Sequence, residues 1–125
     1  MAKILVIDDV AGVRKTIAAI LRRAGHDVTE APDGENGLAT ARTLQPDVVV
    51  TDLLMPHVDG VEVIDRLKSA GSKVPRILAI SGGGSLVGAE EALAMAQTTA
   101  DATLRKPFDA SELNEAVDRL IGRAP

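Results

Sequence analysis

The chain has 125 residues, of which 46% are hydrophobic and 26% are charged. This length suits one domain with one core, and the apolar content argues against a disordered chain. The formal net charge of −4 argues against general nucleic-acid binding, which needs a basic face. The absence of cysteine excludes disulfides and thiolate zinc sites. With no apolar run near the roughly 20 residues of a membrane span and no signal peptide, we expect a soluble cytoplasmic protein.

The first predicted strand covers residues 4–7 and leads directly into Asp8 and Asp9. Its residues are apolar and mostly branched at Cβ, which is typical of a strand buried on both faces of a parallel sheet. A helix is predicted next, from apolar residues at helical spacing, namely Val13, Ile17, Ile20, Leu21 and Ala24. Gly25 ends this helix, and we expect His26 at the surface.

Four basic residues fall outside the apolar stripe of the first helix, and we expect them on a solvated face: Arg14, Lys15, Arg22 and Arg23. A short edge strand follows at residues 27–31. Apolar residues then predict a second helix, namely Leu38, Ala41 and Leu44, which ends before Pro46. The third strand covers residues 48–51 and, like the first, leads into an aspartate, Asp52.

A third helix is predicted after Gly60, with an apolar face formed by Val61, Ile64 and Leu67. The fourth strand covers residues 76–80 and ends on Ser81. A weaker helix is predicted at about residues 88–99, because its apolar stripe consists mainly of alanine.

The last strand covers residues 102–104 and is followed by Lys106 and Pro107. The last helix has Asp109 or Ser111 as its N-cap. Five strands that alternate with five helices predict a single α/β domain over residues 1–125. Because crossovers are right-handed, we expect a doubly wound, flavodoxin-like parallel sheet of order 2-1-3-4-5, with a ligand crevice between strands 1 and 3.

Polar residues that end the predicted strands define a candidate site. Asp8 and Asp9 follow the first strand, and Asp52 follows the third. Carboxyl ends of parallel strands lie at one edge of the sheet, so the three carboxylates converge, and a cation or a proton has to offset their repulsion. Together with the hydroxyl of Ser81 and the ammonium of Lys106, they predict a site that binds Mg²⁺ and handles phosphate.

The order and spacing of these residues resemble the receiver domain of two-component response regulators, over essentially the whole chain. The matching motifs are Asp8-Asp9, residues 52–56, Asp59-Gly60, Ser81 and Lys106-Pro107-Phe108. The resemblance implies that Asp52 is the nucleophile, which accepts a phosphoryl group from a phosphohistidine or a small-molecule donor. It also implies signalling by altered protein contacts rather than by turnover of a substrate.

The resemblance further implies how Mg²⁺ is held. Asp9, Asp52 and the backbone carbonyl of Leu54 would bind the ion directly, and Asp8 would bind it through water. The apolar side chain of Leu54 cannot orient an attacking water, so we expect slow loss of the phosphoryl group.

For the phosphoryl group itself, the resemblance implies that Lys106 pairs with one oxygen and that Ser81 donates a hydrogen bond. A cis bond before Pro107 would point the lysine into the site. The implied partners are a histidine kinase, a histidine phosphotransfer protein or both, and an unidentified protein target, with no nucleic-acid or membrane partner. The ends of the chain, at Met1 and Pro125, suggest a stand-alone receiver.

The sequence departs from the usual receiver pattern at two places that affect how the domain would change conformation on phosphorylation. The family usually carries an aromatic residue three positions before the lysine, whose rotamer reports activation, and here that position is Thr103. Residues 82–84 are all glycine, which lowers the cost of rearranging the loop after the fourth strand. We therefore expect switching to involve residues 82–99.

Three other functions compete with this interpretation. An Mg²⁺ phosphohydrolase resembling the haloacid-dehalogenase class would need an Asp-x-Asp arrangement on the first strand, where this chain has adjacent aspartates. A flavin carrier is excluded by the acidic pair and by the lack of Trp and Tyr. The remaining alternative is a phosphorylation-independent protein-binding module on a receiver scaffold, which Thr103 allows.

Overall fold

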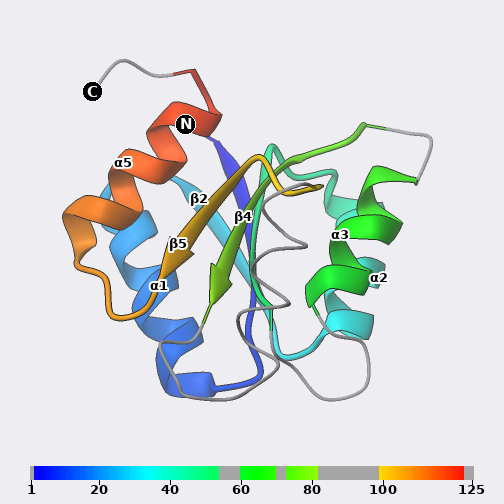
Figure 1. The fold of residues 1–125 in the computed structure, drawn as a ribbon, viewed down its shortest axis with the longest axis horizontal. Coiled ribbons are helices and arrows are strands. Elements are labelled where there is room, and N and C mark those ends of the chain that lie inside the picture. Colours follow the sequence, from blue (N-terminus) through cyan, green and yellow to red (C-terminus); the bar gives the residue numbers. More distant parts are fainter. Residues whose placement is uncertain (1, 54–59, 70–72, 82–98, 123–125) are drawn as a thin grey trace.

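A computed structural model describes residues 2–53, 60–69, 73–81 and 99–122. Five strands form one parallel sheet in the order β2-β1-β3-β4-β5, with α1 and α5 on one face and α2 and α3 on the other (Figure 1). The elements are β1 Lys3–Ile7, α1 Ala11–Arg23, β2 Asp27–Ala31, α2 Gly34–Leu44, β3 Val48–Asp52, α3 Gly60–Lys68, β4 Arg76–Ser81, β5 Ala102–Arg105 and α5 Ala110–Leu120. The predicted α/β fold and strand order are confirmed. The predicted helix at about residues 88–99 and the glycine run at 82–84 fall, apart from Thr99, outside the described residues.

The core consists of two apolar clusters that the sheet separates. Along β1, Ile4 and Val6 belong to the cluster beneath α1 and α5, whereas Leu5 and Ile7 belong to the cluster beneath α2 and α3. Successive side chains of a strand point to opposite faces, so a strand covered on both sides needs apolar residues at every position. This requirement explains the continuous apolar runs from which β1 and β3 were predicted.

The helix boundaries follow local backbone signals. Gly25, after α1, has a φ of +94°, and Gln45, after α2, has a φ of 49°. Asp109 is the N-cap of α5: its Oδ1 accepts a hydrogen bond from the backbone N–H of Glu112 (2.8 Å), and the side chain of Glu112 accepts one from the N–H of Asp109 (3.2 Å). This reciprocal pair decides between the two N-caps that the sequence left open.

The expectation for His26 was wrong. Its residue surface is only 6% exposed, and its Nδ1 accepts a hydrogen bond from the backbone N–H of Ala2 at 3.3 Å. The turn at Gly25 directs the chain back toward the start of β1, where Lys3 and Asp27 are paired in the sheet. The ring therefore packs against the first residues of the chain instead of facing solvent.

Helix α3 begins in close contact with the end of β3. The N–H of Gly60 donates to the carbonyl of Leu53 at 3.0 Å. A Cβ atom on Gly60 would lie 2.6 Å from the Cα of Leu53 and would also overlap the backbone oxygen of Asp52. Glycine at this position thus lets α3 start directly beside the strand that carries Asp52.

We expect Gly60→Ala to destabilise the fold, because backbone atoms of β3 would have to move to accept the added methyl group. The expected loss is roughly 1–3 kcal/mol of unfolding free energy, as is typical of overpacking. The matched control is Gly12→Ala in α1, where a Cβ meets nothing within 4 Å and stability should be unchanged or slightly raised. Urea unfolding followed by circular dichroism measures both, and equal stabilities would contradict the prediction.

Candidate functional site

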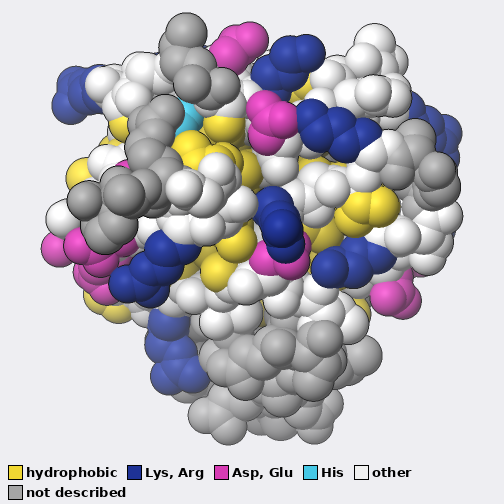
Figure 2. All heavy atoms as spheres, turned by 90° about the horizontal axis from the view of Figure 1, so that it is seen from above, with side chains coloured by type: hydrophobic (Ala, Val, Ile, Leu, Met, Phe, Trp, Pro, Cys, Tyr) yellow, Lys and Arg dark blue, Asp and Glu magenta, His cyan; other side chains and the backbone are white. Residues whose placement is uncertain are grey.

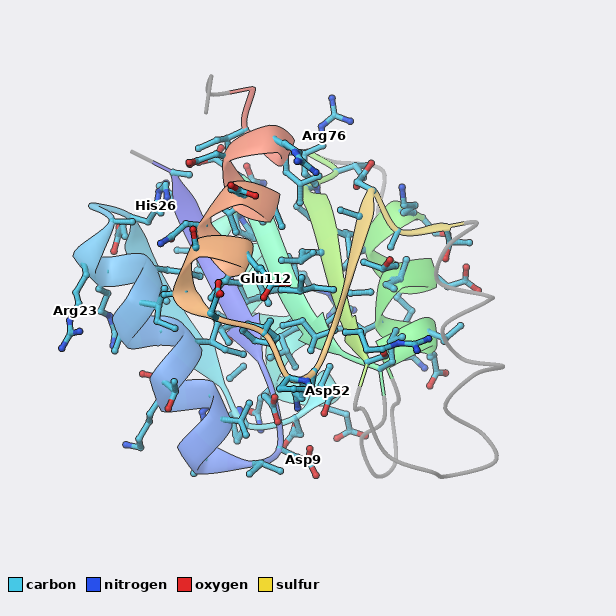
Figure 3. The ribbon with its side chains drawn as sticks, turned by 60° about the vertical axis from the view of Figure 1, so that its left-hand side comes forward. Asp9, Arg23, His26, Asp52, Arg76 and Glu112 are labelled. Carbon is cyan, nitrogen blue, oxygen red and sulfur yellow. The ribbon has the colours of Figure 1, made fainter. Side chains whose placement is uncertain are left out.

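Three carboxylates converge beyond the carboxyl ends of β1 and β3. Carboxylate oxygens of Asp8, Asp9 and Asp52 all lie within 4.8 Å of one another. Asp8 is 1% exposed and Asp52 is 7% exposed, while Asp9 faces solvent. Figure 3 shows Asp9 and Asp52 at the same end of the sheet. The sequence therefore predicted the composition and the place of this acidic cluster correctly.

Backbone contacts hold Asp8 in a fixed orientation. Its N–H donates to the carbonyl of Ala31 on β2 at 3.2 Å, and its Oδ1 accepts a hydrogen bond from the N–H of Val10 at 2.9 Å. Its second carboxylate oxygen, Oδ2, is buried and has no hydrogen-bond partner among the described residues. A buried carboxylate oxygen without a partner costs free energy, so this atom marks the place where a cation would be stabilising.

Lys106 brings a positive charge to the cluster. Its Nζ lies 3.8 Å from Oδ2 of Asp8 and 4.0 Å from Oδ2 of Asp52. The Lys106–Pro107 bond is cis, as the resemblance implied. The N–H of Lys106 donates to the carbonyl of Ser81 at 2.9 Å, which ties the residue to the end of β4. A single ammonium at these distances leaves the cluster of three carboxylates with an excess of negative charge.

Ser81 and Thr103 lie on the neighbouring strands. Ser81, 3% exposed, is the last residue of β4, one position beyond the residue paired with Asp52. Thr103, on β5, is half-buried and pairs with Ala79. Leu54 lies outside the described residues, so its role as a carbonyl ligand and the slow loss of the phosphoryl group remain predictions.

The electrostatics of Asp8 follow from its surroundings. Burial raises the pKa of its carboxyl group, and the charge of Asp9 raises it further, while the hydrogen bond from Val10 and the charges of Lys106 and Arg14 act in the opposite direction. The net shift is upward, so ionised Asp8 costs folding free energy. An arrangement of hard oxygen donors with uncompensated negative charge suits Mg²⁺.

The face at the opposite end of the sheet has a different charge distribution. There, Lys and Arg side chains lie beside Asp and Glu side chains (Figure 2). Lys73 pairs with Asp47 at 2.5 Å, and Arg76 lies 3.6 Å from Asp101. In these two pairs each carboxylate faces a cation, whereas at the carboxyl ends three carboxylates share the ammonium of Lys106.

A family model described as the response regulator receiver domain matches residues 4–118. The chain belongs to this family. The regulator RpaA of Synechocystis is 35% identical over 98% of this receiver chain, and the regulator PhoP of Bacillus subtilis is 32% identical over 98% of it. The chain spans about half the length of each of these relatives, 50% and 49% respectively.

Solved receiver structures have the same fold. The chemotaxis protein CheY4 of Vibrio cholerae superimposes with a TM-score of 0.80 at 30% identity, over 96% of this chain and 98% of that one. A response regulator receiver domain from Clostridium thermocellum gives a TM-score of 0.86 at 29% identity, over 98% of this chain and 95% of that one. No helix among the described residues is long and apolar enough to cross a membrane.

Arg14 is the residue near the site that the sequence placed wrongly. We expected it on a solvated face, but its guanidinium donates to the backbone carbonyl of Asp8 at 2.9 Å. Only 15% of its side chain is exposed. Its position in the first turns of α1, six residues after Asp8, is the one sequence signal that this side chain could reach back to the turn. Lys15 and Arg23 are exposed, as expected.

We expect Asp8→Asn to raise the thermal stability of the metal-free protein, because the amide removes a buried charge and keeps an oxygen for the N–H of Val10. Each kcal/mol gained should raise Tm by about 4 °C. The gain should be largest at neutral pH and disappear below the ordinary carboxyl pKa of 3.8, where Asp8 is protonated in both the folded and the unfolded state. Thermal unfolding followed by circular dichroism across this pH range measures the effect.

The control for this prediction is Asp27→Asn, which removes the same charge from an exposed residue at the start of β2. It should change Tm little at any pH. The addition of Mg²⁺ should stabilise the wild type and Asp27→Asn more than Asp8→Asn. A Tm that falls in metal-free Asp8→Asn would show that the carboxylate contributes to stability and would contradict the prediction.

Proposed function

We propose that this receiver domain accepts a phosphoryl group on Asp52 in a reaction that depends on Mg²⁺. The observation that carries the proposal is the meeting of Asp8, Asp9 and Asp52 at one edge of the sheet with the ammonium of Lys106. Charge of this kind costs stability in the resting protein, so its value has to lie in binding a cation and an anionic group together. Phosphoryl transfer requires a bound cation and an anionic phosphoryl group at the same site.

In the proposed reaction, a carboxylate oxygen of Asp52 attacks the phosphorus of a phosphohistidine. The new P–O bond makes an acyl phosphate, the P–N bond breaks, and the departing imidazole nitrogen keeps the electron pair and is protonated. Asp9, Asp52 and the carbonyl of Leu54 would hold Mg²⁺ directly, with Asp8 acting through water. The chemistry that bound Mg²⁺ supplies is neutralisation of charge on the carboxylates and on the phosphoryl group.

In the proposed reaction, Lys106 and Ser81 would bind the phosphorylated product. The ammonium of Lys106 lies 4.0 Å from the carboxylate of Asp52, so it can move from the carboxylate to a phosphoryl oxygen without a large rearrangement. The buried hydroxyl of Ser81, at the end of the adjacent strand, would donate a hydrogen bond to another oxygen. Such contacts bias a two-state element that a partner can recognise.

The partners of this proposal are a histidine kinase, a histidine phosphotransfer protein or both, and a target protein that reads the altered surface. The domain is a phosphoacceptor rather than a turnover enzyme, and its place is the cytoplasm. The chain spans about half the length of the curated relatives, so signalling through a target protein is likewise proposed and not taken from those relatives. The alternative, a phosphorylation-independent binding module, draws support from Thr103, which offers no aromatic ring beside Ala79.

We expect incubation with acetyl phosphate and Mg²⁺ to raise the intact mass of the protein by one phosphoryl group. The gain should be absent without Mg²⁺ and absent in Asp52→Asn, which keeps the size of the side chain but lacks the nucleophilic carboxylate. Mass spectrometry measures it directly.

A kinase-specific receiver would fail to react with acetyl phosphate yet would still bind beryllofluoride with Mg²⁺ as a phosphoryl analogue. Amide signals of Asp52 and Ser81 in the NMR spectrum report such binding. No gain in mass together with no change in these signals would overturn the proposed function in favour of the phosphorylation-independent module.

A further inference from the structure

We propose that Arg14 is a positioning residue for the acidic site, because it fixes the peptide group that joins Asp8 to Asp9. This inference rests on the proposed function and deepens it. The guanidinium donates from Nη1 to the carbonyl oxygen of Asp8 at 2.9 Å and from Nε to Oε1 of Glu30 at 3.3 Å. The residue thus connects α1, the turn after β1 and strand β2.

The carbonyl of Asp8 needs such a partner because it lies beyond the sheet. Strand β1 ends at Ile7, and the N–H of Asp8 makes the last contact with β2, to Ala31 at 3.2 Å. The peptide group is planar, so a hydrogen bond that holds the oxygen of Asp8 also fixes the N–H of Asp9 and the direction in which the chain enters that residue. Arg14 therefore controls how both carboxylates are presented.

Glu30 keeps the guanidinium in place. Its side chain is 24% exposed and that of Arg14 is 15% exposed, so the pair is largely screened from water. A planar guanidinium that donates in two directions at once has little freedom to rotate. The orientation of the Asp8 carbonyl is in this way tied to β2, an edge strand that carries none of the candidate ligands.

Arg22 provides a matched comparison on the same helix. It donates from Nη1 to the other carboxylate oxygen of Glu30 at 3.3 Å and from Nη2 to the carbonyl of Val28 at 2.9 Å. Both arginines therefore pair with Glu30 and hold one backbone carbonyl, but only Arg14 holds a carbonyl of the acidic site. The side chain of Arg22 is 51% exposed.

The test compares Arg14→Gln, Arg14→Lys and Arg22→Gln with the wild type in the whole chain. Mg²⁺ is titrated into each protein, and the amide NMR signals of Asp9 and Val10 give its affinity. We expect Arg14→Gln to weaken Mg²⁺ binding about tenfold, the size of effect seen when groups that orient metal ligands are lost. Arg22→Gln should keep its Mg²⁺ affinity within about twofold of the wild-type value. Each protein is titrated at the same number of degrees below its own Tm, so that differences in stability do not affect the comparison.

Whether Mg²⁺ affinity falls or rises in Arg14→Gln distinguishes a positioning role of the arginine from the effect of its charge. The loss of a positive charge near the site would by itself draw Mg²⁺ in more strongly, so a weaker affinity in Arg14→Gln has to come from misplaced ligands. Arg14→Lys keeps the charge but not the planar fork, and it should restore the affinity only partly. Phosphorylation by acetyl phosphate at saturating Mg²⁺ should recover in Arg14→Gln toward the wild-type rate.

Two outcomes overturn the inference, and they are distinct from failure of the proposed function. Mg²⁺ affinity in Arg14→Gln that equals or exceeds the wild-type value would show that the arginine does not position the ligands. Equal losses in Arg14→Gln and Arg22→Gln would show that only the shared contact with Glu30 matters. If the wild type itself bound no Mg²⁺ and accepted no phosphoryl group, the proposed function would fail, and the inference would fail with it.

Discussion

The repulsion among three carboxylates at one edge of the sheet is the constraint on which the rest of this structure depends. Two of them, Asp8 and Asp52, are buried, so water screens their interaction poorly. The fold keeps them together by fixing the backbone around them and by placing Lys106 between their oxygens, at 3.8 and 4.0 Å. Under the proposed function, the stability lost at this edge would be offset when the site binds a cation and a phosphoryl group.

The parallel sheet makes this arrangement possible. Strands β1 and β3 are neighbours and run in the same direction, so residues that follow them emerge side by side. Both strands are covered by helices on both faces, and the carboxylates therefore meet in a rigid setting. The close start of α3 at Gly60 keeps the end of β3 equally well defined.

Most of the fold could be predicted because its signals are local. Continuous apolar runs predicted the buried strands, and the aspartates at their ends predicted the acidic cluster. His26 and Arg14 were placed wrongly because their environments depend on distant segments, namely the start of β1 and the end of β2. A basic residue off the apolar stripe of a helix usually faces solvent, and no local pattern reveals that a backbone carbonyl beyond the sheet needs its guanidinium.

Carboxylates at the two ends of the sheet have opposite effects on the stability of the fold. At the amino ends, Lys73 and the N–H of Lys3 both bind Asp47, which lowers the pKa of that carboxyl group and makes its charge favourable. At the carboxyl ends, burial raises the pKa of Asp8 and makes its charge unfavourable. The charge of Asp47 therefore adds to the stability of the fold, whereas the charge of Asp8 reduces it. Arg14 links the two kinds of interaction, since it pairs with Glu30 and also donates to the backbone carbonyl of Asp8 in the acidic turn.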